Sequence, residues 1–405
     1  MKRKENKLII LPKLLIVLLF LHLFASCQPM ENLSGSLSRD ETSEMEKQQT
    51  PSTTNEGLSA TAISNIVGVS DSQCCIVGNN TLHRTNDSGQ VWSDVTNTIK
   101  TAYSDEQIRL GTNSETDSDR LIKDGSRIFF FHKTQKTIAV SVSENYCSTW
   151  TKLGLLEYEG HDLSGSQVVS ISFPASTNGW ILVSTNKGLN HEDVLVYRTK
   201  NSGKSWSLIT DTLDQNTKNK ELATGSKNGI TFIDEMNGWI TGDSHASEIL
   251  LYRSQDGGET WNKSNLEVPT GTTAQSGSAT SYKVVYANGQ IILPVKLGNE
   301  KSGMDLIFFY STSKGDEFSY SSPVNSKDGS FLYSIIDDLQ IKVIDRQSSI
   351  LYSTENLGKA WDPISLSANV TQFVFFSKTN GWAIINDRLY LTTDTGENWS
   401  IVPIE

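Results

Sequence analysis

The sequence predicts an all-β protein built from seven copies of a four-stranded antiparallel unit. All nine tryptophans fall in one of two repeated motifs, and seven copies of the first motif recur at spacings of 58, 56, 55, 57, 43 and 38 residues. Short apolar runs are bounded mostly by Gly, Asn, Asp and Gln, and no long apolar run with a helical period follows the N-terminal segment. These observations favour a repeated β-structure over two average globular domains.

The first motif is an eight-residue box with the pattern Ser/Thr-x-Asp-x-Gly-x-x-Trp, and residues 254–261 form its clearest copy. The Asp or Asn side chain accepts backbone hydrogen bonds, the Gly adopts a positive φ, and the Trp packs back over the turn. This chemistry is used fully by the turn, so we expect a structural role. The residues in the Asp, Gly and Trp positions are Asp87, Gly89 and Trp92; Asn145 and Trp150; Asn201, Gly203 and Trp206; Asp256, Gly258 and Trp261; Ser313, Gly315 and Phe318; Asn356, Gly358 and Trp361; and Asp394, Gly396 and Trp399.

The second motif lies upstream of several boxes and combines a strand, an Asn-Gly turn and a second strand. Its clearest copy is Phe232-Ile-Asp-Glu-Met-Asn-Gly-Trp-Ile240, and related runs span 173–181 and 376–383. The first unit has Cys74 and Cys75 in place of Gly-Trp. One unit is therefore strand a, Asn-Gly turn, strand b, loop, strand c, box turn and strand d.

The boxes resemble the Asp-box, or BNR repeat, of sialidases and related β-propellers. Together, the two motifs most resemble the photosystem II assembly and stability factor-like family, many bacterial members of which have no link to photosynthesis. The resemblance covers residues 61–405 and implies a seven-bladed β-propeller of four-stranded antiparallel blades with Asp-box turns. About 49 residues per unit agrees with known blade lengths. For function, the resemblance implies help in assembling a membrane complex, although one fold hosts many functions.

The N-terminus has the features of an export signal. Five basic residues lie among the first 13, residues 14–21 are wholly apolar, and Phe24-Ala-Ser-Cys27 follows. Residues 1–27 resemble a lipoprotein signal peptide ending at a lipidated Cys27, and the alternative is a plain anchor helix. Residues 28–60 are too poor in large apolar residues to fold, so we expect a disordered tether. The predicted location is outside the cytoplasm, lipid-anchored to the cell membrane or outer membrane.

The charge of the chain is acidic and limits the classes of partner. Its net charge is −11, and removal of residues 1–27, with five basic residues and one acidic residue, would leave about −15. Nucleic acid is therefore an unfavourable partner, and we expect no cofactor and no metal. In an oxidising compartment, the three cysteines Cys74, Cys75 and Cys147 leave two readings open. One of the pair could bond to Cys147, or all three could be buried small residues that fill Gly and Trp positions.

Candidate binding residues lie on the face opposite the boxes, where the long loops are expected. His161, His191, Asp193, Asp243 and His245 come from two neighbouring units, and they indicate either a polar ligand or metal site or ordinary solvated loops. The preferred function is a non-catalytic, membrane-tethered module that binds an unidentified envelope protein or glycan. The alternatives are a carbohydrate-binding surface lipoprotein and a sialidase-like glycoside hydrolase. The hydrolase lacks support because no Arg-Ile-Pro string precedes the first box, so we expect no enzyme activity.

Overall fold

The computed structural model describes residues 63–70, 72–103, 108–110, 119–246, 248–270, 272, 277–299, 301–367, 369–386 and 388–404. The expected signal peptide, Cys27 and the expected tether at 28–60 lie outside these ranges, as do parts of two long loops. Within these ranges, no helix has the length and apolar character that crossing a bilayer requires.

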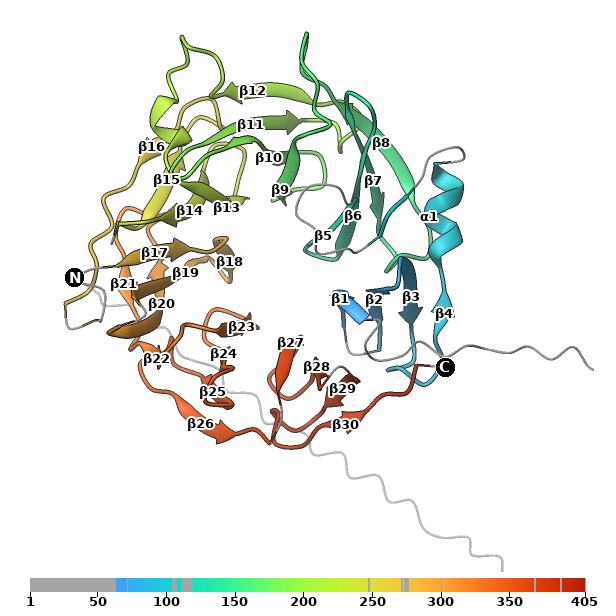
Figure 1. Ribbon diagram of the computed structural model, residues 1–405, viewed down its shortest axis with the longest axis vertical. Helices are drawn as coiled ribbons and strands as arrows, with labels where there is room; N and C mark the ends of the chain where they lie inside the picture. Colours follow the sequence, from blue (N-terminus) through green and yellow to red (C-terminus); the bar gives the residue numbers. More distant parts are fainter. Residues whose placement is uncertain are drawn as a thin grey trace, which may run out of the picture. The chain divides into compact units, whose positions relative to one another are not determined.

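The fold is all-β, and five of its sheets are four-stranded antiparallel meanders in which consecutive strands pair. Figure 1 shows these sheets arranged around a common centre, with the first strand of each sheet innermost. The first three sheets are β1 (Ile63–Val69), β2 (Cys74–Gly78), β3 (Thr81–Thr85) and β4 (Ser93–Asp94); β5 (Arg120–Asp124), β6 (Arg127–Lys133), β7 (Ile138–Ser143) and β8 (Thr151–Leu156); and β9 (Gln167–Ser172), β10 (Gly179–Lys187), β11 (Glu192–Thr199) and β12 (Ser207–Asp211). The last two are β23 (Phe331–Ile335), β24 (Ile341–Asp345), β25 (Ile350–Thr354) and β26 (Asp362–Ser365); and β27 (Val370–Phe375), β28 (Gly381–Ile385), β29 (Arg388–Thr392) and β30 (Ser400–Ile401).

The remaining strands form one ten-stranded sheet, which the sequence analysis expected as two separate units. The pairing of β14 with β17 joins its two halves, through Asp243 opposite Thr280 and Ser244 opposite Ala279. The first half is β13 (Ser226–Phe232), β14 (Gly238–Ser244), β15 (Leu250–Ser254) and β16 (Asn262–Lys263). The second half is β17 (Ser278–Ser281), β18 (Val285–Ala287), β19 (Gln290–Asn299), β20 (Gly303–Ser311), β21 (Ser319–Tyr320) and β22 (Val324–Ser326). Two short helices, α1 (Thr96–Ala102) and the 3-10 helix η2 (Lys220–Ala223), lie in loops.

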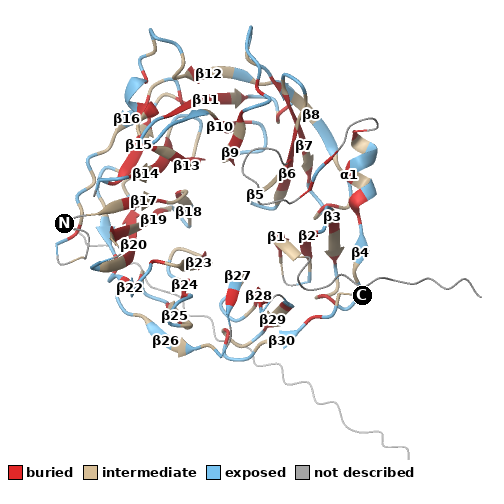
Figure 2. Cartoon of the chain, viewed as in Figure 1, coloured by how far each residue is buried: buried red, intermediate tan, exposed pale blue. Residues whose placement is uncertain are grey.

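The hydrophobic core lies between neighbouring sheets because each sheet presents side chains on both faces. One cluster combines Val67 and Leu82 of the first sheet with Ile128 and Phe130 of the second. Figure 2 shows that burial is concentrated on the inner and middle strands, whereas the outermost β26 and β30 are largely exposed. Every sheet is thus stabilised mainly by its two neighbours.

The seven box segments all form one hydrogen-bonded turn. In residues 254–261, the Asp256 carboxylate accepts the Thr260 N–H at 3.0 Å, and the Ser254 hydroxyl accepts the Gly258 N–H at 2.8 Å. The degraded copy at 143–150 keeps both bonds, with Asn145 accepting from Thr149 at 2.9 Å and Ser143 accepting from the Cys147 N–H at 2.9 Å. The fourth and fifth positions both have positive φ in every copy, including non-glycine residues such as Tyr146 and Cys147. The turn therefore tolerates non-glycine residues at its fourth and fifth positions when the side chains at the first and third positions still accept their backbone hydrogen bonds.

Several boxes also contact the second strand of the preceding sheet. The indole of Trp180 in β10 donates to the Gly257 carbonyl, the fourth position of the next box, at 2.8 Å. Trp239 in β14 packs against Gly315, the fifth position of the next box, but its indole N–H donates no hydrogen bond to the described residues. The contact explains why the box needs a small residue at its fifth position. A Cβ at Gly315 would lie 3.1 Å from the Trp239 indole nitrogen.

The first and last sheets close the ring with the same contact, and within the described ranges they exchange no strand. Trp382 in β28 lies against the first box, where a Cβ on Gly89 would come within 3.2 Å of its ring. The Trp92 and Trp382 rings meet edge to face at 6.3 Å between centroids. The Gln372 side chain adds two hydrogen bonds across the junction, accepting the Ile66 N–H at 2.9 Å and donating to the Asn65 side chain at 2.7 Å. Side-chain packing and the hydrogen bonds of Gln372 thus contribute to joining the last sheet to the first.

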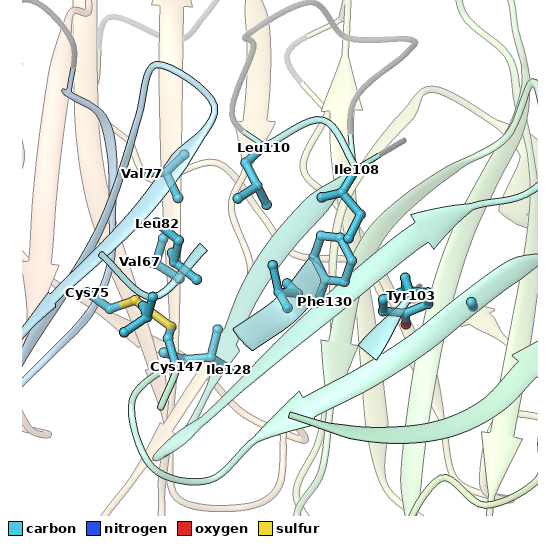
Figure 3. Packing of buried hydrophobic residues seen from close by; sticks show 13 residues of the cluster. Val67, Cys75, Val77, Leu82, Tyr103, Ile108, Leu110, Ile128, Phe130 and Cys147 are labelled. Atoms are coloured by element: carbon cyan, nitrogen blue, oxygen red, sulfur yellow. A yellow bond between two sulfur atoms is a disulfide. The ribbon is translucent and has the colours of Figure 1, made fainter. Parts of the chain in front are cut away.

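A disulfide bonds the first two sheets and decides between the two readings of the cysteines. Cys75 and Cys147 are bonded, with their Cα atoms 6.8 Å apart, and Cys74 is a buried free thiol. Figure 3 shows the bond packed among Val67, Leu82 and Ile128. Cys75 pairs with Arg84 as Trp239 pairs with Arg253, so Cys75 occupies the tryptophan position of its sheet. Cys147 occupies the glycine position of the next box, and the disulfide therefore replaces the Trp–Gly contact.

Candidate functional site

The β10–β11 hairpin contains His191 and Asp193. The His191 Nε2 lies 3.1 Å from the Asp193 Oδ1, so the structure brings together two of the five predicted residues. Asp193 also accepts the Thr212 hydroxyl at 3.2 Å and the Asn186 amide at 3.3 Å. The two carboxylate oxygens are therefore satisfied within the hairpin and by the strand beside it.

The tip of this hairpin, residues 186–191, is held by the neighbouring sheet. His245 bonds through its Nε2 to the Leu189 carbonyl at 2.8 Å. The Gly225 N–H donates to the Asn190 carbonyl at 3.1 Å, and the Gly188 N–H donates to the His191 carbonyl at 2.7 Å. These bonds fix the backbone on both sides of Leu189, whose side chain is 95% exposed. We call this segment, together with His245, the tip surface.

Two buried charged residues, Glu192 and Lys227, support the base of the tip surface, and sequence reasoning missed both. Glu192 is fully buried and accepts the Ser184 hydroxyl and the Lys227 N–H. The Lys227 ammonium donates to the carbonyls of Thr224 and Gly225, each at 2.8 Å. Burial lowers the pKa of Lys227 to about 8, against the nearby charge of Glu192, which raises it. Two adjacent acids at the start of a strand, Glu192 and Asp193, were the available signal for a buried carboxylate.

The other two predicted residues are not part of the tip surface. Asp243 is in β14 and accepts the Asn228 amide at 2.7 Å. The His161 ring stacks on Tyr158 at 4.0 Å between centroids, and the Tyr158 hydroxyl donates to Asp211 at 2.8 Å. Burial and then this bond to Asp211 raise the pKa of Tyr158 to about 12. No group of three or more His, Cys, Asp or Glu side chains suited to a metal occurs within the described ranges.

The fold is that of β-propeller proteins. A polysaccharide lyase of the ulvan lyase family PL25 has a TM-score of 0.50 at 11% identity, covering 85% of this chain and 96% of that chain. A prolyl endopeptidase has a TM-score of 0.52 at 9% identity, covering 85% of this chain and 50% of that chain. YCF48 bound to a D1 peptide has a TM-score of 0.48 at 14% identity, covering 83% of this chain and 93% of that chain. No family model matches the sequence, and no curated protein matches it.

These comparisons correct the expectation that the protein is not an enzyme. That expectation rested on the box-repeat resemblance and on the missing Arg-Ile-Pro string. The lyase and the endopeptidase share the fold with this chain and are enzymes. A propeller of this kind therefore does not exclude catalysis, because function depends on the residues of a site and not on the scaffold. The expectation of no enzyme activity was wrong because the absence of a sialidase motif says nothing about other classes of enzyme.

Proposed function

We propose that this protein binds a partner protein through the tip surface. One observation carries the proposal: Leu189 is 95% exposed, yet the backbone around it is held by hydrogen bonds from two sheets. An apolar side chain on a fixed backbone can enter a partner's pocket with little loss of loop entropy. A loop that served only as a connection would have no need of the buried Glu192 and Lys227 beneath it.

The test is site-specific cross-linking of the full chain in its own membranes. A photo-reactive amino acid replaces Leu189, and the matched control carries it at Lys200, which is exposed at the opposite end of β11. We expect one recurrent protein to cross-link from position 189 and not from position 200. Equal labelling from both positions, or no protein from position 189, would contradict the proposal. A glycan array that binds the chain while no protein cross-links would favour the carbohydrate alternative.

A second proposal concerns location: the chain is exported and tethered by a lipid on Cys27, with residues 28–60 as a flexible spacer. Its support is the basic, apolar and Phe-Ala-Ser-Cys order of the first 27 residues. The Cys27→Ala variant should lose the lipid mass by mass spectrometry and should leave the membrane fraction. Retention of both properties by the variant would remove the lipid anchor from the proposal.

A third proposal concerns architecture: the propeller has seven blades and its boxes are Asp-box turns. The ten-stranded sheet counts as two blades, β13–β16 and β17–β22, because only two residue pairs join β14 to β17. Each half contains one box, at 254–261 and at 311–318. A crystal structure with six or eight units around the centre would overturn this count.

A further inference from the structure

Two adjoining cavities are lined by residues of several innermost strands, which surround the centre of the ring in Figure 1. One has a volume of about 630 Å³ and the other about 570 Å³. They share Lys123 of β5, Val285 of β18 and Ile335 of β23 as lining residues. Together they form a central channel with walls from several sheets. Cavity volumes of this size are typical of small-molecule sites.

The channel is lined by polar and apolar groups in similar measure, and its charged lining residues are Lys123, Lys283 and Asp124. Lys283 is compensated, because its ammonium lies 3.6 Å from the Asp124 carboxylate and donates to the Ile171 carbonyl at 2.7 Å. Asp124 is used further, since it accepts the Phe173 N–H at 2.8 Å. The single carboxylate of the lining is thus committed to Lys283 and to the backbone.

Lys123 is the charge without a counterion. Its side chain is open to the channel, and its only hydrogen bond with the described residues is a long one of 3.5 Å to the Val69 carbonyl. No carboxylate of the described residues lies within ion-pair distance of its ammonium. Lys123 is an exposed residue, so an incoming anion can reach its ammonium directly.

The first cavity is also lined by apolar residues, beside the polar Ser70 and Ser334. Val69, Val285, Ile335 and Phe375 stand around Lys123, and none of them carries a polar side chain. The chain as a whole has a net charge of −11, so an attraction for anions at this point has to be local.

We propose that the central channel binds a small organic carboxylate, whose anionic group contacts Lys123 and whose apolar part lies against Val285 and Ile335. The Lys283–Asp124 pair closes one side of the site and supplies a second, weaker donor. The site is separate from the tip surface and does not depend on the partner-binding function.

The test is binding of benzoate to the full chain by isothermal titration calorimetry, with benzamide as the neutral ligand of the same shape. A hydrogen bond to a charged group contributes enough that we expect benzoate to bind at least about tenfold more tightly than benzamide. The Lys123→Met variant should lose that preference, and the Lys301→Met variant, altered at an exposed lysine outside both cavities, should keep it. Iodide, an inorganic anion, should bind more weakly than benzoate because it lacks the apolar part.

Three results would overturn the proposal: no benzoate binding, equal binding of benzoate and benzamide, or unchanged benzoate affinity in folded Lys123→Met. Circular dichroism checks that this variant is folded. A second readout needs no variant: in protein labelled with ¹³C at lysine Cε, benzoate should raise the pKa of Lys123, because an anion favours the charged ammonium. An unmoved Lys123 titration would also count against the site. The Leu189→Asp variant should bind benzoate normally, which separates failure here from failure of the tip surface.

Discussion

The contact between sheets β9–β12 and β13–β16 and the contact between sheets β1–β4 and β5–β8 occupy equivalent positions but use different chemistry. In the first, the Trp180 ring fills the space over the next box and donates to the Gly257 carbonyl. In the second, Cys75 and Cys147 occupy the two positions and are covalently bonded. The comparison shows that the propeller requires a filled and fixed junction there, while the residue types that provide it can change.

Removal of the tryptophan at the first contact should give the largest effect. Trp180→Ala would leave a cavity between two sheets and an unpaired Gly257 carbonyl, and we expect a loss of about 3–5 kcal/mol in the free energy of unfolding. Urea denaturation measures the loss. Trp206→Ala is the matched control, because Trp206 is only partly buried in its own box, and it should cost less. Equal losses would contradict the view that the contact between sheets is the main role of Trp180.

Breaking the disulfide at the second contact should have the next largest effect. Cys75 and Cys147 are 72 residues apart in sequence, and opening a loop of this length is expected to cost about 2–4 kcal/mol through the entropy of the unfolded chain. The measurement is urea denaturation of Cys75→Ser. Cys74→Ser is the control, since Cys74 is buried but not bonded, and it should lose less. An unfolding free energy unchanged by Cys75→Ser would show that packing alone holds this junction.

Exchange of one chemistry for the other sharpens the comparison. The double variant Cys75→Trp with Cys147→Gly rebuilds the Trp–Gly arrangement of the first contact, whereas either single change leaves a mismatch. We expect the double variant to be more stable than the sum of the single effects predicts, by about 1 kcal/mol or more. Additive losses in the double-mutant cycle would mean that the two positions are not interchangeable between junctions.

The repeat explains how much of this arrangement the sequence could predict. Box spacing and the alternation of turns and strands predicted all-β meanders, and each box position named above lies in such a turn. The disulfide stayed one of two readings because the sequence does not say which face of a box meets the preceding sheet. The join between β14 and β17 was missed because it depends on the path of a long loop. Glu192, Lys227 and Leu189 were missed because burial and anchoring of a hairpin tip are set by the neighbouring sheet.

Lys342 provides a third version of the same contact and gives the smallest predicted effect. It lies in the tryptophan position of β24, opposite Ser353, and its ammonium donates to the Thr395 carbonyl of the next box at 2.8 Å, as Trp180 does to Gly257. The ammonium also lies 4.6 Å from the centre of the Phe375 ring. Burial lowers the pKa of Lys342 to about 8. An ionised group thus occupies a junction that elsewhere holds an aromatic ring or a disulfide.

The sign of its pH dependence follows from that pKa. Between about pH 8 and the ordinary lysine value of 10.5, the unfolded chain binds more protons at this position than the folded chain, so its contribution to folding becomes more favourable as pH rises. Lys342→Met has no such titration. We therefore expect the unfolding free energy of the natural protein to rise, relative to that of Lys342→Met, from pH 7.5 to about pH 9.5. The difference between the two unfolding free energies removes the effect of every other titrating group. A difference that stays flat or falls with pH would show that the ammonium is at least as well stabilised in the junction as in water.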